Sequence, residues 1–131
     1  MMYRLLHITI VPILAPTPQN VIQKRMSDLG RDWMSYNAFC WLLWTNKSIL
    51  TVSEMVMGDV NPGDQVLVMG VNATEVPNGR LPEWVWAWFN RPRNPFTGEV
   101  QTPAIPAPEA LNLFDQSQDY FPLNDPGKAQ F

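Results

Sequence analysis

The chain has 131 residues and a formal net charge of −3, which fits one globular domain and leaves no room for two independent cores. Its single cysteine, Cys40, excludes an internal disulfide framework and indicates a reducing compartment or assembly inside a cell. No apolar stretch reaches the roughly 18 residues of a transmembrane helix, and the start of the chain lacks the layout of a signal peptide. We therefore expect a cytoplasmic or virion protein that is not secreted through a signal peptide.

The composition changes sharply near Arg91. Residues 1–91 contain all six tryptophans and seven acidic against seven basic side chains, whereas residues 92–131 contain seven of the thirteen prolines and carry the whole net charge. A segment of about 90 residues buries enough surface for one modest core, but the remainder lacks the composition for a core of its own. We predict a domain over residues 1–91 and an extended proline-rich arm over residues 92–131.

The first predicted elements are a strand and a helix. β-Branched residues are dense between Leu5 and Leu14, which predicts a buried strand. Thr17 followed by proline matches a helix start, with Thr17 as the N-cap and the proline in the first helical position. Apolar residues then follow at helical spacing, and Gly30 is expected to end the helix.

The next elements are a central strand, a second helix and a third strand. Residues 33–45 carry aromatic and β-branched side chains on both faces, which predicts a central strand, with a hairpin broken near Ser35–Asn37 as an alternative. Ser48 is the expected N-cap of a helix that ends at Gly58. The sequence Asn61-Pro62-Gly63-Asp64 predicts a turn, and residues 65–71 predict another buried strand.

The stretch 82–90 fits two structures. Its alternating tryptophans fit a strand, whereas Pro82 followed by Glu83 is typical of a helix start, and Trp84, Val85, Trp88 and Phe89 would form one helical face. We favour the helix. Together the elements predict an α+β fold, a ferredoxin-like sheet with helices on one face, followed by the extended proline-rich C-terminal arm.

Residues 48–89 also carry a family resemblance. Their parts are the short helix capped by Ser48, the turn that ends in Asp64, a hydrophobic strand, and the closing sequence from Leu81 to Phe89. With the aromatic strand at 39–44, they resemble the SinR-like proteins, small relatives of the ferredoxin-fold nuclease subunit of CRISPR adaptation. The resemblance covers residues 3–90 and implies a ferredoxin-like sheet with helices on one face, often dimerising through the sheet.

The nuclease members of that wider family share an aspartate at the end of the first strand, where a metal ion is held between subunits. Here the first strand runs from His7 to Pro12 without a carboxylate, and the nearest acids in the sequence, Asp28 and Asp32, come beyond the first helix. Metal-assisted phosphodiester cleavage requires oxygen ligands for the ion. We therefore expect no catalytic residues, no metal and no cofactor, and the resemblance does not extend to the activity.

His7-Ile8-Thr9-Ile10 matches the histidine element of the two-histidine phosphoesterases. That chemistry needs two such elements, one imidazole as base and one as acid, and this chain contains one histidine. We interpret His7 as a strand histidine that is hydrogen-bonded or partly exposed. Cys40 is interpreted as a small buried hydrophobe, because a catalytic thiol needs a base and the only histidine is distant in sequence.

Nucleic-acid binding requires a positive footprint. Basic residues concentrate only at Lys24-Arg25, Arg31, Arg91 and Arg93, in a predicted domain whose charges sum to zero. We therefore do not expect a nucleic-acid partner. The six tryptophans are interpreted as core and interface residues rather than as a stacking platform for single strands.

The predicted arm combines prolines with large apolar side chains. Its prolines disfavour regular helix and favour extended backbone, yet disordered linkers ordinarily avoid large apolar groups. We predict that the arm binds other protein chains, either copies of itself or components of a larger complex, and that the protein is part of an oligomer or assembly without a membrane partner. The expected partner-binding residues are Phe96, Ile105, Leu111, Leu113, Phe114, Tyr120, Phe121 and Phe131.

Three functions stay open at this stage. The first is a non-catalytic assembly protein such as a phage virion protein that decorates or cements a capsid. The second is a degenerate SinR-like protein that binds nucleic acid or acts as an endoribonuclease. The third is an inhibitor that docks on a host defence complex. We prefer the first, because a neutral domain with an acidic, apolar arm suits assembly.

The missing carboxylate in the first strand predicts that the purified protein has no metal-dependent nuclease activity. Incubation with RNA and DNA in the presence of Mg²⁺ or Mn²⁺ should leave both substrates intact, and His7→Ala should change nothing. Cleavage that a chelator abolishes would contradict this prediction.

Overall fold

The computed structural model describes residues 2–72 and 74–101, which belong to two compact units. The first, the sheet unit, comprises the described residues up to Arg80 together with Pro92–Gln101. The second contains a helix within Leu81–Arg91. The expected arm residues 102–131 lie outside the described residues.

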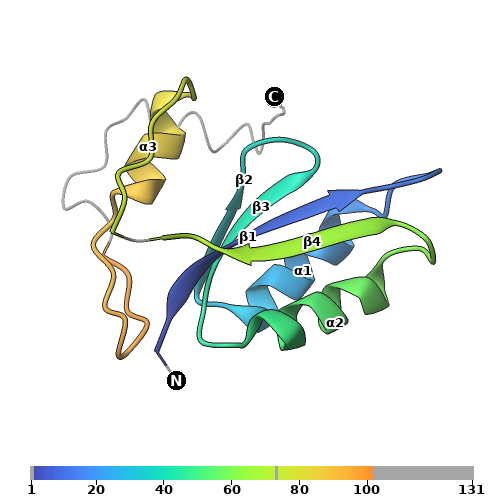
Figure 1. The fold of residues 1–131 in the computed structure, drawn as a ribbon, viewed down its shortest axis with the longest axis horizontal. Helices are drawn as coiled ribbons and strands as arrows, with labels where there is room; N and C mark the ends of the chain where they lie inside the picture. The colour runs from blue at the N-terminus through green and yellow to red at the C-terminus, as the bar shows by residue number, and fades with distance from the viewer. Residues whose placement is uncertain (1, 73, 102–131) are drawn as a thin grey trace. The chain divides into compact units, whose positions relative to one another are not determined.

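The sheet unit is an α+β structure built on one four-stranded antiparallel sheet. Its elements are β1 (Arg4–Val11), α1 (Gln19–Leu29), β2 (Asp32–Ser35), β3 (Cys40–Thr45), α2 (Ile49–Asp59) and β4 (Gln65–Gly70). The strands lie in the order β2-β3-β1-β4, and β2 and β3 form the hairpin that the sequence left as an alternative. Helices α1 and α2 cover the same face of the sheet (Figure 1). This arrangement confirms the α+β class and is compatible with a ferredoxin-like sheet.

The core lies between this face and the two helices. It forms there because the side chains of the central strands alternate between the two faces, and the register aligns the buried positions of β1 with those of β3. Every second residue of β1 is buried, and its partners on β3 are buried with it, as in the pairs Leu6↔Leu43 and Ile8↔Trp41. All the β3 residues after Cys40 are buried, which confirms the expected central strand with two apolar faces. The helices contribute Ile22, Met26, Leu29, Val52 and Val56 to the same cluster.

The start of α1 differs from the prediction. Pro18, not Thr17, occupies the N-cap position, and no side chain caps the helix. The Thr17 hydroxyl is buried and has no hydrogen-bond partner in the described structure. Proline sets the backbone angle at the cap but offers no acceptor for the first helical N–H groups, so they are left without a side-chain partner.

Gly30 ends α1 as expected, but for a different reason. Its φ of −142° is extended backbone that any residue adopts. A Cβ on Gly30 would instead overlap the carbonyl oxygen of Trp44 and lie 2.6 Å from Leu43 Cδ1. Arg31, the next residue, donates its backbone N–H to Trp44 O at 2.9 Å. The glycine is therefore needed because the chain passes directly against β3.

The second helix begins as predicted, and the third predicted strand differs in burial. Ser48 caps α2, with its hydroxyl accepting from Thr51 N at 3.0 Å. The following turn is also confirmed, since Gly63 has a φ of 93°. In contrast, β4 is an edge strand and not a buried one, and Leu67 is 56% exposed. In the described structure β4 pairs with β1 only, so one of its edges has no neighbouring strand. The apolar composition of the strand did not reveal this, because an edge position depends on which strands pair.

Pro92–Gln101 forms a hairpin rather than the extended backbone expected for this stretch. Asn94 N donates to Glu99 O at 2.8 Å, and Gly98 N donates to Asn94 O at 2.7 Å. Gly98 has a φ of 80°, and a Cβ there would collide with the ring of Tyr3. We call residues 92–101 the root hairpin. It lies beside the start of β1, where Tyr3 N donates to Pro95 O at 2.7 Å (Figure 1).

Trp44 is the main attachment point of the root hairpin. Its indole N–H donates to Gly98 O at 2.9 Å, and the Tyr3 ring stacks on its ring with 5.8 Å between the two ring centres. The guanidinium of Arg93 lies 5.8 Å from the centre of the same ring and pairs with Asp32 at 3.3 Å. These contacts explain why the first ten residues beyond Arg91 belong to the sheet unit despite their proline-rich composition.

The second unit contains α3 (Glu83–Phe89), which confirms the favoured helix. Pro82 is its N-cap and Glu83 lies in its first turn, as the sequence pattern indicates. Val85 and Trp88 are buried. Their spacing of three residues fits one face of a helix and explains why a strand, with its period of two, is not formed.

Gly30→Ala should destabilise the protein by about 1–3 kcal/mol, because the added methyl group forces β3 and the end of α1 apart. Gly58→Ala is the matched control, since a Cβ at Gly58 meets no atom within 4 Å and a helical alanine is favoured by about 0.5–1 kcal/mol. Urea unfolding of both variants measures the difference. Equal effects of the same sign would contradict the close approach at Gly30.

Candidate functional site

A group of polar side chains lies on the sheet face opposite to α1 and α2. The alternation that buries Ile8 places His7 and Thr9 on this face of β1. The strand register sets Thr9 directly opposite Cys40 on β3. Tyr36, at the β2–β3 turn, joins them, and we call these four residues the polar cluster.

Two hydrogen-bond contacts connect the polar cluster. His7 Nε2 lies 2.7 Å from the Tyr36 hydroxyl, and Thr9 Oγ1 lies 3.9 Å from Cys40 Sγ. Burial, followed by a hydrogen bond to Cys40, raises the pKa of Tyr36 to about 12. Burial lowers the pKa of His7 below its ordinary 6.5. At neutral pH the imidazole and the phenol are therefore both uncharged.

The chemistry open to the polar cluster follows from these charges. A neutral His7 can accept a proton and, as the hydrogen-bond partner of Tyr36, brings no positive charge to the cluster. The expectation that His7 is a hydrogen-bonded strand histidine is confirmed. Cys40 is half-buried rather than buried, because it begins β3 beside the turn.

Sequence reasoning missed Tyr36 and the proximity of His7 to Cys40. The two residues are 33 positions apart, and only the pairing of β1 with β3 brings them to one face. The alternation of His7 and Thr9 with buried residues was the available signal that they share a face. Nothing in the sequence showed that the turn would return Tyr36 to them.

The basic residues that concentrate in the sequence are mostly engaged with carboxylates. Arg25 forms two contacts with Asp59, at 2.6 and 3.1 Å. Lys24 lies 3.8 Å from Asp28, one helical turn away, and Arg93 pairs with Asp32. Pairing offsets part of the positive charge that these side chains would otherwise present to a phosphate backbone.

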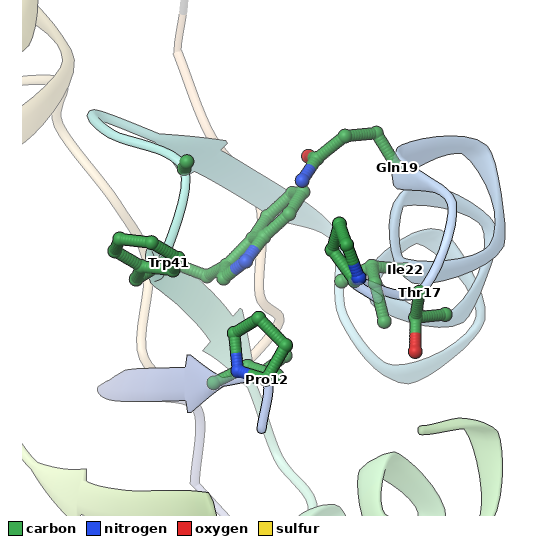
Figure 2. A pocket seen from close by; sticks show the side chains of 9 residues that line it. Pro12, Thr17, Gln19, Ile22 and Trp41 are labelled. Atoms are coloured by element: carbon green, nitrogen blue, oxygen red, sulfur yellow. The ribbon is translucent and has the colours of Figure 1, made fainter. Parts of the chain in front are cut away.

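An apolar pocket of about 370 Å³ opens at the end of β1, on the face that carries the helices. Figure 2 shows Pro12, Gln19 and Ile22 arranged around Trp41, with Thr17 beside Ile22. The remaining lining residues are Ile10, Pro16, Ala38 and Phe39. None of the nine carries a charge, so the pocket suits an apolar or aromatic group.

One of the predicted partner-binding residues belongs to the part of the chain that the structure describes. Phe96 lies in the root hairpin and is 76% exposed. Ile105, Leu111, Leu113, Phe114, Tyr120, Phe121 and Phe131 lie outside the described residues. The structure adds large exposed apolar side chains that the sequence did not single out, among them Ile13, Leu14 and Phe39 near the pocket.

Comparisons of the chain with family models, with curated proteins and with solved structures give no match. Within residues 2–72 and 74–101, no three His, Cys, Asp or Glu side chains gather closely enough to hold a metal ion. None of the described helices has the length and apolar character needed to cross a bilayer.

The lowered pKa of His7 predicts a pH-dependent stability. The unfolded chain takes up a proton near pH 6.5, whereas the folded chain takes it up only at a lower pH. The free energy of unfolding should be fully retained above pH 6.5 and should fall as the pH drops through the folded-state pKa of His7. An NMR titration of the single imidazole and thermal unfolding on both sides of this range measure the effect.

His7→Gln is the control, because its side chain does not titrate and this part of the pH dependence should disappear. A His7 pKa at or above 6.5 in the folded protein would contradict the prediction.

Proposed function

We propose that this protein is a non-catalytic assembly protein, in which a ferredoxin-like domain serves as a platform and the C-terminal arm binds neighbouring protein chains. The element order β-α-β-β-α-β and the strand order β2-β3-β1-β4 support the ferredoxin-like assignment. The arm is residues 102–131, together with the exposed Phe96 of the root hairpin.

The observation that carries the proposal is the fixed starting point of the arm. Four contacts hold the root hairpin against the sheet: Trp44 Nε1 to Gly98 O, Arg93 to Asp32, Arg31 to Thr97 O at 3.0 Å, and Tyr3 N to Pro95 O. The chain that follows Gln101 therefore leaves the domain from a defined place. A proline-rich segment with apolar side chains that begins at a rigid point suits reaching onto a neighbour.

The surface of the sheet unit also favours protein partners. Large apolar side chains are exposed on several elements, including Leu14 at 87%, Leu50 at 66% and Leu67 at 56%. Charged groups are few, since 16% of the chain is Asp, Glu, Lys or Arg. Depletion of charged side chains is typical of the central part of surfaces that other proteins cover.

Within this class we propose a virion role, as a protein that decorates or cements a capsid. The neutral domain and the acidic, apolar arm support this choice. The SinR-like alternative, a nucleic-acid binder or endoribonuclease, receives less support, because Lys24, Arg25 and Arg93 are paired with carboxylates. An inhibitor of a host defence complex would use the same kind of surface, and partner identification distinguishes it.

Ending the chain after Gln101 should leave the domain as stable as the full protein and abolish its binding to partner chains. Ending it after Arg91 is the matched variant, because it also removes the root hairpin. This shorter chain should lose about 2–4 kcal/mol of stability with the hydrogen bonds and the stacking at Trp44. Light scattering after size-exclusion chromatography, with and without shell components, measures assembly, and urea unfolding measures stability.

If the chain that ends at Gln101 assembled as the full-length protein does, the arm hypothesis would be wrong. Equal stability of the two shortened chains would show that the root hairpin is not attached as described.

A further inference from the structure

The apolar pocket at the end of β1 is bounded by two loops that are held in place. Asp64 Oδ1 accepts from Ile13 N at 3.1 Å, and Asn61 Nδ2 donates to Ala15 O at 3.0 Å, which fixes the loop between β1 and α1. In the opposite wall, Asn37 Oδ1 accepts from both Phe39 N and Cys40 N at 2.8 Å. A pocket whose walls are already ordered can bind without a large ordering cost.

The pocket has the size and lining of an anchor site for an aromatic side chain. An apolar cavity of about 150 Å³ is enough for benzene, so about 370 Å³ accommodates one aromatic ring and part of its neighbour. Trp41 contributes to the wall with its ring almost fully buried. The lining includes an exposed apolar side chain as well, since Phe39 is 47% exposed. Aromatic anchors in such pockets, surrounded by further apolar contacts, dominate many protein interfaces.

The beginning of α1 adds an electrostatic preference. The helix starts at Gln19, which itself lines the pocket, and it has neither a side-chain cap nor an acidic residue in its first turn. The positive end of the helix dipole is therefore not compensated by this helix, and it favours a negative group placed next to the anchor. The best ligand is an aromatic residue with an acidic neighbour.

The chain itself contains such a ligand. Phe114 is followed by Asp115, and Asp119 precedes Tyr120 and Phe121. Residues 102–131 carry one basic side chain, Lys128, against four acidic ones, so their net charge is −3. This negative charge complements the uncapped helix.

The root hairpin and the pocket lie at opposite ends of β1. The hairpin bonds to Tyr3, just before the strand, whereas Ile10 and Pro12 line the pocket at its end. Eight residues of strand separate the two places by about 26 Å. Eleven residues, 102–112, precede the anchors, and at the roughly 3.1 Å per residue of extended backbone they would reach about 34 Å, which is enough to bring the anchors to the pocket of a neighbouring copy.

We propose that the pocket bounded by Pro12, Ile22 and Trp41 binds the aromatic anchors 113–121 from the arm of a second copy of this chain. This inference rests on the proposed arm function and adds its docking site. Because the arm leaves one end of the sheet unit and the pocket opens at the other, the contact is head-to-tail. Repetition of a head-to-tail contact produces a closed ring or, where the ring does not close, an open filament.

Two variants of the full-length chain, each with one defective end, test the proposal. Ala38→Trp fills the pocket from an exposed position in the turn, with Ala38→Ser as its matched control. The arm variant replaces Phe114, Tyr120 and Phe121 by serine. In sedimentation velocity, the sedimentation coefficients of wild type and Ala38→Ser should rise with protein concentration. Each defective variant alone should sediment as a monomer. A mixture of the two variants should form a 1:1 dimer that does not grow, because it joins the single working arm to the single working pocket.

The outcomes separate this inference from the arm function. Self-association of Ala38→Trp at wild-type strength, with a monomeric arm variant, would overturn the pocket assignment and leave the arm function standing. Wild-type association by the arm variant would overturn both. A wild type that is monomeric at every concentration, or a mixture that stays monomeric, would overturn docking between copies.

The charge component has its own measurement. Replacing Asp115 and Asp119 by asparagine should weaken self-association about two- to fivefold at low salt, and less at high salt. An unchanged dissociation constant would show that the beginning of α1 takes no part in binding.

Discussion

The antiparallel pairing of β1 with β3 is the constraint on which the rest of the structure depends. Thr9 lies opposite Cys40 and Ile8 opposite Trp41. A shift by one residue would place the core-facing side chains of one strand opposite the outward-facing side chains of the other. On one face this register assembles the core beneath α1 and α2. On the other face it brings His7 and Thr9 to Cys40.

The same pairing also defines two distinct ends of the sheet unit. At one end, Trp44 faces Leu5 and receives the root hairpin through its indole N–H and its ring. At the other end, Trp41 contributes to the apolar pocket between the α1 entry loop and the β2–β3 turn. Gly30 allows the backbone after α1 to pass against β3 near the first of these ends. The two tryptophans are three residues apart on one strand, and their side chains therefore lie on opposite faces of the sheet. Trp41 lines the pocket at one end, and Trp44 binds the root hairpin at the other.

An arm fixed at one end and a pocket at the other give the proposed assembly a direction. The pocket needs no rearrangement of its bounding loops, because side chains of Asp64, Asn61 and Asn37 already hold them. The root hairpin similarly defines where the arm begins. Both features suit the proposed platform, because a binding geometry that is set before a neighbour arrives lowers the ordering cost of binding.

The local elements were largely predictable from the sequence, because each depends on neighbouring residues. The alternation in β1, the apolar faces of β3, the Ser48 cap and the Pro62-Gly63 turn all carry local signals, and the structure contains each of these elements. The helix at 83–89 likewise followed from Pro82 and Glu83. Thr17 misled the prediction, because the pattern of a capping residue before proline does not fix which residue the helix starts from.

Other features were decided only by tertiary structure. The edge position of β4 depends on which strands pair, and its apolar composition resembles that of a buried strand. The root hairpin was expected to be extended, because it belongs to the proline-rich stretch of the chain. Its attachments to Trp44 and Asp32 gave no local signal, because they join residues 54 and 61 positions apart. The polar cluster and the pocket likewise combine distant segments. Sequence alone determined the local elements, since their causes are short-range, whereas strand pairing decided the sites, since it brings together residues that no local pattern connects.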